Sequence, residues 1–566
     1  MSEAEPMKPA DATPAPQMAA GTGPWSSQLP SWVKHLPPCN AACPAGENIQ
    51  AWLGLAQAGN YRAAWETLVQ DNPLPAVHGR VCYHPCETSC NREELDSAVS
   101  IHAVERFLGD MAAGEGWPCP IDAEPSGKRV LVVGAGPSGL SAAYHLTRRG
   151  HAVEIREAGP LPGGMMHFGI PAYRLPREDL MKEVRRIEQM GVRIVLNHKV
   201  EEMLAEKADG EFDAVFVAIG AHVGKHIEIP ARDAAKVLDA VTLLRAVGSG
   251  GSPRLGRRVA IYGGGDTAMD AARTAKRLGA DEAVIIYHRD RAHMPAHAVE
   301  VDEALEEGIK IKWLTSIKEI GETSLTVEVV ELDAGGGPRG TGQFETLQAD
   351  SVVLALGQQT DSAFLKRVPG IEFEPDGAVI VGPDMMTGHE GIFGGGDMVP
   401  GERTVTAAVG HGKRAARHID AWLRGKAYRN PSKNPPVTFD MLDLLLFLEA
   451  PGKREHELPL TERTTFAEVV QGLNEPEARF EAGRCLSCGN CFECDNCYAA
   501  CPEQAIVRLG RGLGYRVEAD LCTGCGICFE ECPCHAIEMV AQAMPEDAPA
   551  GLLGEPIIPD RFKLRE

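Results

Sequence analysis

The stretch KRVLVVGAGPSGLSAAYHLTRRGHAVEIREA, residues 128–158, decides the fold of the central part of the chain. A β-branched run predicts a strand, and a glycine loop, a helix and a second strand follow it. Gly134 suits the tight turn, Gly136 lets the backbone approach a pyrophosphate, and Gly139 permits close packing of helix on strand. Glu157 ends the second strand, where its carboxylate can accept hydrogen bonds from a ribose diol. This order predicts a dinucleotide-binding βαβ unit.

A second unit of the same kind is RRVAIYGGGDTAMDAARTAKRLGADEAVIIYHRDR, residues 257–291. Small residues recur at the same spacing in its loop, at Gly263, Gly265 and Ala268. His288 and Arg289 stand where the first unit has its acid. A cation in place of a carboxylate suits a 2′-phosphate, which favours NADP and leaves NAD as the alternative.

Strand-like and helical stretches alternate over residues 126–425, which predicts parallel α/β sheets. A third signal, GIFGGGDMVPGERTVTAAVGHGKRAARHI at 391–419, is a strand, a glycine turn with Asp397 and a helix. Together these patterns resemble the two-dinucleotide-binding-domain flavoprotein superfamily. The resemblance implies an NAD(P) domain inserted in an FAD domain, with Asp397 on the flavin ribityl chain.

The resemblance also implies the residues that bind each cofactor. Those for FAD are Gly134, Gly136, Pro137, Ser138, Gly139, Glu157, Gly164, Asp397, Thr404 and Thr406. Those for NADP are Gly263, Gly265, Asp266, Thr267, Ala268, His288 and Arg289. A hydride passes directly between stacked rings, so no catalytic acid or base is expected.

The segment PGGMMHFGIPAYRLPRE, residues 162–178, narrows the resemblance. It looks like the glutamate synthase small, NADPH-oxidising subunit, a family that includes the N-terminal half of dihydropyrimidine dehydrogenase and the large subunit of the bifurcating NADH-dependent ferredoxin–NADP oxidoreductase. The resemblance covers roughly residues 36–425. This chain departs from it at His288, where many members have Arg.

The C-terminal part carries two copies of the spacing C-x2-C-x2-C-x3-C-P. In such runs the first three cysteines hold one [4Fe-4S] cluster and the fourth crosses to the other. The spacing therefore predicts two ligand sets, and a structural zinc site is the weaker alternative. The sets are Cys491, Cys494, Cys497 and Cys532, and Cys522, Cys525, Cys528 and Cys501.

The N-terminal cysteines are too few for two clusters: Cys39, Cys43, Cys82, Cys86 and Cys90. This region resembles a helical domain of the glutamate synthase small-subunit family that holds two [4Fe-4S] clusters. In that family an RCxxC pair stands just upstream of the cysteines that match Cys39 and Cys43. That pair is missing here, whereas EAGRCLSC at 481–488 matches it. The resemblance thus implies that Cys485 and Cys488 join Cys39 and Cys90, with a spare or labile pair as the alternative.

The other N-terminal cluster would take Cys43, Cys82 and Cys86. By the same resemblance its fourth ligand is Glu105, for which an ordinary helix-surface acid is the alternative. Of the 17 cysteines, Cys119 and Cys534 stay unassigned.

The domain boundaries follow from these patterns. The predicted order is a disordered tail (1–30), a helical iron–sulfur domain (31–125), the first part of the FAD domain (126–232), the NAD(P) domain (233–350), the second part of the FAD domain (351–425), a linker (426–483), a ferredoxin-like α+β module (484–545) and a tail (546–566).

Composition limits the partners. The formal net charge of −23 argues against nucleic acid or an anionic membrane as a partner. No apolar run reaches the ~20 residues of a membrane span. The acidic, Pro/Ala-rich N-terminus lacks the apolar core of a signal peptide, and the cysteines read as metal ligands, so a cytoplasmic location is expected.

These features predict an electron-transfer oxidoreductase subunit that contains FAD, NADP(H) and four [4Fe-4S] clusters. Its partner would be another subunit of a hetero-oligomer or ferredoxin, such as a thiamine-dependent 2-oxoacid:ferredoxin oxidoreductase. The alternatives are a glutamate synthase small subunit that supplies NADPH electrons, and a self-contained NAD(P)H-dependent reductase of a small substrate. The added ferredoxin module favours the first hypothesis.

Overall fold

The computed structural model describes residues 27–225, 229–230, 236–431, 433–510 and 512–541. They form two compact units. The described residues of Met1–Pro38, Lys433–Glu449 and Leu486–Glu566 make up the smaller unit, and those of Cys39–Ser432 and Ala450–Cys485 make up the larger one. The predicted tails lie mostly outside the described residues.

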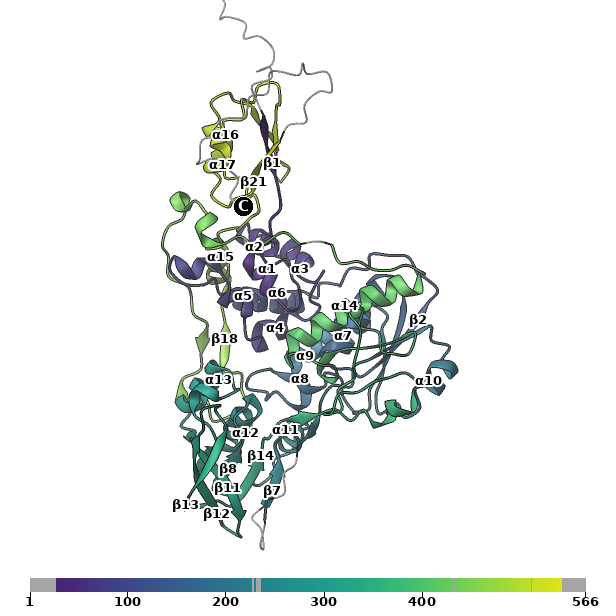
Figure 1. The fold of residues 1–566 in the computed structure, drawn as a ribbon, viewed down its shortest axis with the longest axis vertical. Helices are drawn as coiled ribbons and strands as arrows, with labels where there is room; N and C mark the ends of the chain where they lie inside the picture. Colours follow the sequence, from purple (N-terminus) through teal and green to yellow (C-terminus); the bar gives the residue numbers. More distant parts are fainter. Residues whose placement is uncertain (1–26, 226–228, 231–235, 432, 511, 542–566) are drawn as a thin grey trace, which may run out of the picture. The chain divides into compact units, whose positions relative to one another are not determined.

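The first dinucleotide-binding domain of the larger unit is built on a five-stranded parallel sheet in the order β16-β5-β2-β3-β4. Its strands are β2 (Arg129–Val133), β3 (Ala152–Arg156), β4 (Arg193–Val195), β5 (Ala214–Val217) and β16 (Ile392–Gly394). Helices α7 (Pro137–Arg148) and α14 (Val405–Leu423) lie side by side in this domain (Figure 1). Three further helices are α8 (Met165–Phe168), α9 (Arg177–Gln189) and α10 (Met203–Asp209).

The second dinucleotide-binding domain has its own parallel sheet, in the order β10-β9-β8-β14-β7. The strands are β7 (Lys236–Asp239), β8 (Arg258–Tyr262), β9 (Glu282–Ile286), β10 (Lys310–Lys312) and β14 (Ser351–Leu354). Its helices are α11 (Ala240–Gly248), α12 (Asp266–Arg277) and α13 (Ala298–Glu306), and an antiparallel sheet adds β11 (Thr315–Ile320), β12 (Ser324–Leu332) and β13 (Pro338–Gln348).

The second domain is inserted in the first. The chain leaves through β6 (Val223–Gly224) and returns through β15 (Gln358–Gln359), and these two strands pair with each other. The sheet of the first domain is completed only after the return, by β16. The predicted two-domain flavoprotein topology is confirmed.

The N-terminal cysteines lie among short helices of the larger unit. These are α1 (Pro38–Ala42), α2 (Ile49–Gln57), α3 (Tyr61–Leu68), α4 (Pro75–Val81), α5 (Pro85–Thr88) and α6 (Ile101–Glu115). Two glycines let α4 and α6 cross closely. A Cβ at Gly79 would lie 2.5 Å from the backbone nitrogen of Arg106, and one at Gly109 would lie 2.7 Å from Ala76 Cα. This crossing sets α6 against the helix that leads into Cys82.

Gly109→Ala is expected to destabilise the protein by about 1–3 kcal/mol, because the added methyl group meets backbone atoms that cannot rotate away. Gly114→Ala on the same helix is the control: nothing lies within 4 Å of its Cβ position, and alanine is the better helix former by up to about 1 kcal/mol. Thermal unfolding of the full chain should show a lower melting temperature for the first variant only. Equal melting temperatures would contradict the close crossing.

The smaller unit differs from the prediction at its N-terminal edge. Strand β1 (Gln28–Trp32) pairs antiparallel with β21 (Ile537–Ala541) of the ferredoxin-like module. Residues 28–30 were expected in a tail and residues 31–38 in the helical domain, so this is a correction. The alternation signal in β1 is weak, since the strand is short and contains Pro30.

The rest of the smaller unit has the expected α+β character. It contains a second antiparallel pair, β19 (Ile506–Gly510) and β20 (Gly514–Val517). The short helix α16 (Asn496–Ala500) packs against β19, and α17 (Ile527–Glu530) packs against α16 and β21. Residues 433–449, expected in a linker, also belong to this unit.

Residues 450–483 of the expected linker belong to the larger unit, and so do residues 484–485, which were expected in the ferredoxin-like module; the latter is a correction. Residues 450–485, called the strap below, contain β17 (His456–Glu457), β18 (Val470–Gly472) and α15 (Glu475–Gly483). An asparagine at position 474 caps α15 through a capping box with Glu477. Helix α15 packs against α2 and α6.

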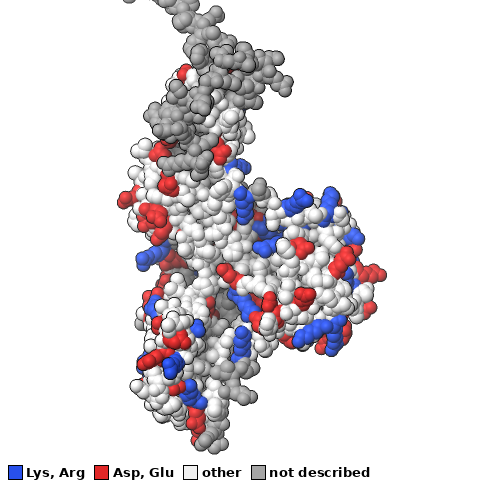
Figure 2. Space-filling model, viewed as in Figure 1, with Lys and Arg blue, Asp and Glu red and all other residues white. Residues whose placement is uncertain are grey.

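Within the described ranges, no helix combines the length and apolar character needed to cross a bilayer. On the face drawn in Figure 2, the acidic and basic side chains of the described residues are interspersed.

Candidate functional site

A cavity of about 600 Å³ lies in the larger unit at the first glycine loop and beside Asp266 and Thr267 of the second. Residues of both dinucleotide-binding domains and of the helical domain line it. The predicted FAD residues in its wall are Gly134, Gly136, Pro137, Ser138, Glu157, Gly164, Asp397 and Thr404. Asp266 and Thr267 of the second loop also line it, whereas Gly139, Thr406, Gly263, Gly265, Ala268, His288 and Arg289 do not.

The first glycine loop has the form that a pyrophosphate needs. Gly134 has φ +105°, and a Cβ there would run into the carbonyl oxygen of Ala218. A Cβ at Gly139 would run into the Gly134 carbonyl oxygen, so only glycine lets α7 start this close to β2. At Gly136 nothing lies within 4 Å of the Cβ position. The open side of Gly136 is therefore the place where a phosphate can approach the backbone and the start of α7.

Glu157 is held by the backbone of its own loops. Its Oε2 accepts a hydrogen bond from the Ala135 N–H at 2.8 Å, and its Oε1 accepts one from the Gly159 N–H at 2.7 Å. A carboxylate has about four acceptor sites, so two remain for a ribose. The two backbone bonds fix the side chain at the cavity wall.

Asp397 and Ser138 supply polar groups that suit a bound cofactor. Burial raises the pKa of Asp397 to about 6, and Arg403 opposes the shift. The Ser138 hydroxyl is buried without a hydrogen-bond partner in the part of the chain that the structure describes. Buried polar groups in folded proteins are nearly always satisfied. With the open glycine loop, these groups fit FAD.

The second glycine loop repeats the geometry. Gly263 has φ +149°, and its Cβ would run into the Ala355 carbonyl oxygen, while the Cβ position of Gly265 is open. The backbone N–H of His297 donates to one carboxylate oxygen of Asp266 at 2.9 Å, and the Nδ1 of its ring lies 2.9 Å from the other. Asp266 thus anchors the segment before α13 to the loop, beside the cavity.

His288 and Arg289 follow β9 and lie outside the cavity wall. Burial, and then the nearby Arg289, lower the pKa of His288. The Nε of Arg289 is buried without a hydrogen-bond partner among the described residues. A buried guanidinium nitrogen with no partner fits an anionic group such as a 2′-phosphate.

The sequence did not reveal that the helical domain reaches the cavity. Tyr83, next to Cys82, stacks on His297 with ring centroids 3.3 Å apart and planes 4° apart. Arg174, from the first dinucleotide-binding domain, makes a similar contact between domains: it lies 3.0 Å from Asp270 on α12 and also lines the cavity. No local pattern marks such contacts, because each joins segments more than ninety residues apart.

Cys43, Cys82 and Cys86 are brought together as predicted. Burial and then the charge of Glu47 raise the pKa of Cys43, and Glu105 and Cys82 contribute. Burial raises the pKa of Cys86 far above its usual range, with smaller contributions from Glu87, Cys43 and Cys82. Thiols that crowd in this way suit a cationic iron cluster, which stabilises their thiolates.

Glu105 is buried on α6, and its Oε1 accepts a hydrogen bond from Asn72 Nδ2 at 2.6 Å. It is not the exposed helix-surface acid of the alternative interpretation. Of the other predicted set, Cys39, Cys90 and Cys485 pack against the core of the larger unit. Cys488 belongs to the smaller unit, beside Val437 and Leu486.

The C-terminal cysteines gather in the two predicted groups. Burial, and then Cys532, Cys491 and Cys494, raise the pKa of Cys497 to about 12. Burial, and then Cys522, Cys525 and Cys501, raise the pKa of Cys528 to about 12. The second group also surrounds a small cavity of its own. Each crossing cysteine lies with the three cysteines of the opposite run, as the spacing rule requires.

Two nucleotide loops on one cavity, together with grouped thiols, define a flavin-dependent NAD(P)H oxidoreductase with 4Fe-4S domains. The family model "Pyridine nucleotide-disulphide oxidoreductase" matches residues 128–412, and the chain belongs to this family. Two iron–sulfur models match as well, "Dihydropyrimidine dehydrogenase domain II, 4Fe-4S cluster" at 34–117 and "4Fe-4S dicluster domain" at 490–536.

Similar proteins include a subunit beta of an NADP(+)-dependent formate dehydrogenase from Moorella thermoacetica, 36% identical, with 80% of this chain and 70% of that protein covered. The subunit beta of an NADPH-Fe(3+) oxidoreductase from Geobacter sulfurreducens is 33% identical, with 80% and 75% covered. The glutamate synthase [NADPH] small chain of Escherichia coli is 34% identical, with 68% and 89% covered. The predicted resemblance to the glutamate synthase small subunit is confirmed. The chain is an NADPH-dependent FAD and iron–sulfur oxidoreductase subunit.

Proposed function

We propose that this chain exchanges a hydride with NADP(H) at the cavity and single electrons with a partner oxidoreductase subunit or ferredoxin through four [4Fe-4S] clusters. FAD, when bound, supplies the step between two-electron and one-electron chemistry. The chain's own residues bind and orient the two nucleotides. No acid or base is assigned to the transfer.

The observation that carries this proposal is that residues of the first dinucleotide-binding domain, the second dinucleotide-binding domain and the helical domain all line the cavity. Gly136 opens into it from the first loop, and Asp266 borders it from the second. Val81 and Tyr83 line it on either side of Cys82. A cluster on Cys82 would therefore stand at the cavity wall, where electrons can leave for the helical domain.

The site residues are proposed as the sequence predicts them. FAD takes the first loop with Asp397, and NADP takes the second loop with Arg289. The cluster nearest the cavity uses Cys43, Cys82, Cys86 and Glu105. Glu105 suits this set because it is buried and lies close enough to interact electrostatically with each of the three thiols. The second N-terminal cluster uses Cys39, Cys90, Cys485 and, from its spacing to Cys485, Cys488. The C-terminal module holds the remaining two.

The partner is proposed as another one-electron oxidoreductase subunit. Two of the similar proteins are named as subunits beta of larger oxidoreductases, and this supports a hetero-oligomer. The thiamine-dependent 2-oxoacid oxidoreductase remains one candidate within this class. The C-terminal module favours it over a glutamate synthase large subunit, since an extra pair of clusters suits a low-potential one-electron partner.

The test is cofactor analysis of the anaerobically purified full chain, followed by rapid mixing with NADPH. We expect about 16 iron atoms per FAD, four for each cluster, and reduction of the clusters after the flavin. About eight iron atoms per FAD would leave only the C-terminal pair. Flavin bleaching with every cluster still oxidised would contradict the electron path.

A further inference from the structure

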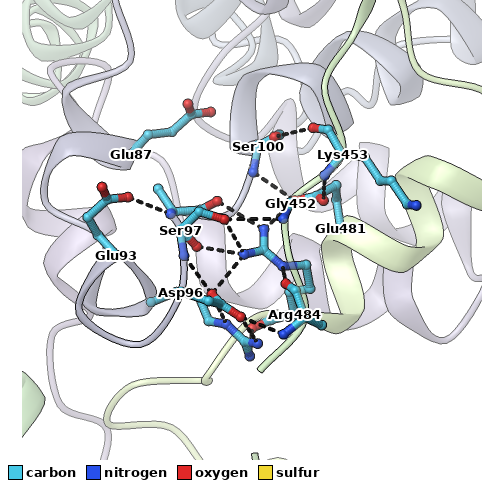
Figure 3. Close-up of polar contacts among 12 residues, drawn as sticks. Glu87, Glu93, Asp96, Ser97, Ser100, Gly452, Lys453, Glu481 and Arg484 are labelled. Atoms are coloured by element: carbon cyan, nitrogen blue, oxygen red, sulfur yellow. Dashed lines mark hydrogen bonds and ion pairs between the residues drawn. The ribbon is translucent and has the colours of Figure 1, made fainter. Parts of the chain in front are cut away.

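The strap ends at a buried arginine that directly precedes Cys485. The Arg484 side chain is only 2% exposed, although it carries a permanent charge. Its guanidinium nitrogens donate to oxygens at 2.6–3.0 Å on the strap and on the segment before α6 (Figure 3). The acceptors are the carbonyl oxygens of Ala450, Ala98 and Ser97, the Ser97 hydroxyl, Glu481 Oε2 and Asp96 Oδ1.

The charges around Arg484 balance. Asp96 lies 2.9 Å from Arg484 and 2.6 Å from Arg92, and Glu481 lies 2.8 Å from Arg484. The carboxylate of Glu481, fully buried, also accepts hydrogen bonds from the backbone N–H groups of Ser100 and Lys453. The hydrogen bond from Arg92 holds the pKa of Asp96 well below its usual range. Two cations and two anions therefore form one closed set.

Such a set is costly to bury, and burial of apolar residues would hold two segments together at least as well. What the set adds is geometric definition, because a guanidinium fork fixes the direction of each bond. The backbone is fixed too: Arg92 Nη1 donates to the Arg484 carbonyl oxygen at 3.0 Å. Arg92 is two residues after Cys90, and Arg484 is the residue before Cys485.

We propose that Arg484 is a positioning residue that holds Cys485 beside Cys90 as a ligand of an N-terminal iron–sulfur cluster. This inference rests on the proposed function, in which Cys485 completes that ligand set. The strap packs across the helical domain and supplies the thiol of Cys485. The hydrogen bonds from Arg484 and Arg92 to Asp96 fix the position of the strap on that domain. Arg484 does not touch the reacting atoms.

Four variants of the full chain test the proposal after anaerobic purification: Cys485→Ser, Arg484→Gln, Arg484→Lys and Arg479→Gln. Arg479 is the matched control, since it is exposed on α15 and its Nε donates a hydrogen bond to the Gln57 carbonyl oxygen at 3.1 Å. The measurements are iron per FAD, the electron paramagnetic resonance spectrum after dithionite reduction, and the rate of flavin reduction by NADPH.

Arg484→Gln is expected to lose the same resonance signal as Cys485→Ser, together with about four of the roughly 16 iron atoms per FAD. Its FAD content and flavin reduction rate should be unchanged, since Arg484 does not line the cavity. Arg479→Gln should keep every signal. Arg484→Lys keeps the charge but lacks the fork, so the same signal should weaken or shift.

The outcomes distinguish the positioning role of Arg484 from the ligand set of the proposed function. If Cys485→Ser loses a cluster and Arg484→Gln keeps it unaltered, the positioning role is wrong and the proposed function stands. If Cys485→Ser keeps all clusters, the ligand set in the proposed function is wrong. Should Arg484→Gln lose FAD or precipitate, the lysine variant decides: an unaltered spectrum there overturns the proposal.

Discussion

Gly265→Ala should slow the reduction of bound flavin by NADPH about 100-fold while FAD stays bound. The residue has φ −97° and ψ 175°, which alanine adopts without strain, and no protein atom lies within 4 Å of the Cβ position. The added methyl group therefore leaves the fold intact but stands where the pyrophosphate must approach the second loop. A displacement of about 1 Å at the reacting rings costs on the order of 10²-fold in rate. Stopped-flow absorbance of the flavin measures the effect.

Two controls accompany this variant. Gly54→Ala makes the same change in open space on α2, far from both loops in sequence, and should leave the rate unchanged. Gly136→Ala makes it in the first loop and should lower FAD content instead. If Gly265→Ala reduced as fast as the unsubstituted protein, the second loop would not bind the nicotinamide nucleotide.

Cys82→Ser is the second variant with a large expected effect. It should lose one cluster, about four iron atoms per FAD, and electron delivery to a one-electron acceptor should fall to the background of reduced flavin alone. The reason is that Cys82 lies between two residues of the cavity wall, so the cluster proposed on Cys82 would be the exit for electrons from the flavin. Reduction of the flavin by NADPH should persist, because the glycine loops are untouched.

Cys119→Ser is the matched control for this experiment. Its thiol also packs against the core of the larger unit, and burial raises its pKa to about 11, but no cluster is assigned to it. It should keep all iron and the full rate of electron delivery. Rapid freeze-quench spectroscopy with NADPH distinguishes the two variants, and full delivery by Cys82→Ser would place the exit elsewhere.

The local parts of the site could be predicted from the sequence. A glycine loop between strand and helix is a short-range pattern, since the clash that forbids a side chain at Gly139 comes from Gly134, five residues away. The ferredoxin-like runs are similarly local. Each of these features needs only neighbouring residues to define its geometry.

The strap and β1 could not be predicted in the same way. Residues 450–483 of the strap were predicted as linker because their prolines and charges suggest solvent, yet Glu481 is buried by a partner almost four hundred residues upstream. Arg484, predicted in the ferredoxin-like module, is likewise buried by a partner that far upstream. Strand β1 acquires its conformation from β21, a partner about five hundred residues downstream in the chain. The stack of Tyr83 on His297 likewise has no local signal. A run of polar residues indicates exposure to solvent only when no group distant in the sequence satisfies the hydrogen bonds of its side chains.

The pairing of β1 with β21 has a consequence for biosynthesis. Trp32 is synthesised about five hundred residues before its strand partner Ile537. Strand β1 therefore stays without its native partner until β21 has been synthesised, and an unpaired strand edge invites aggregation. Closure of this strand pair therefore comes only after both dinucleotide-binding domains, which lie between the two strands in the chain, have been synthesised.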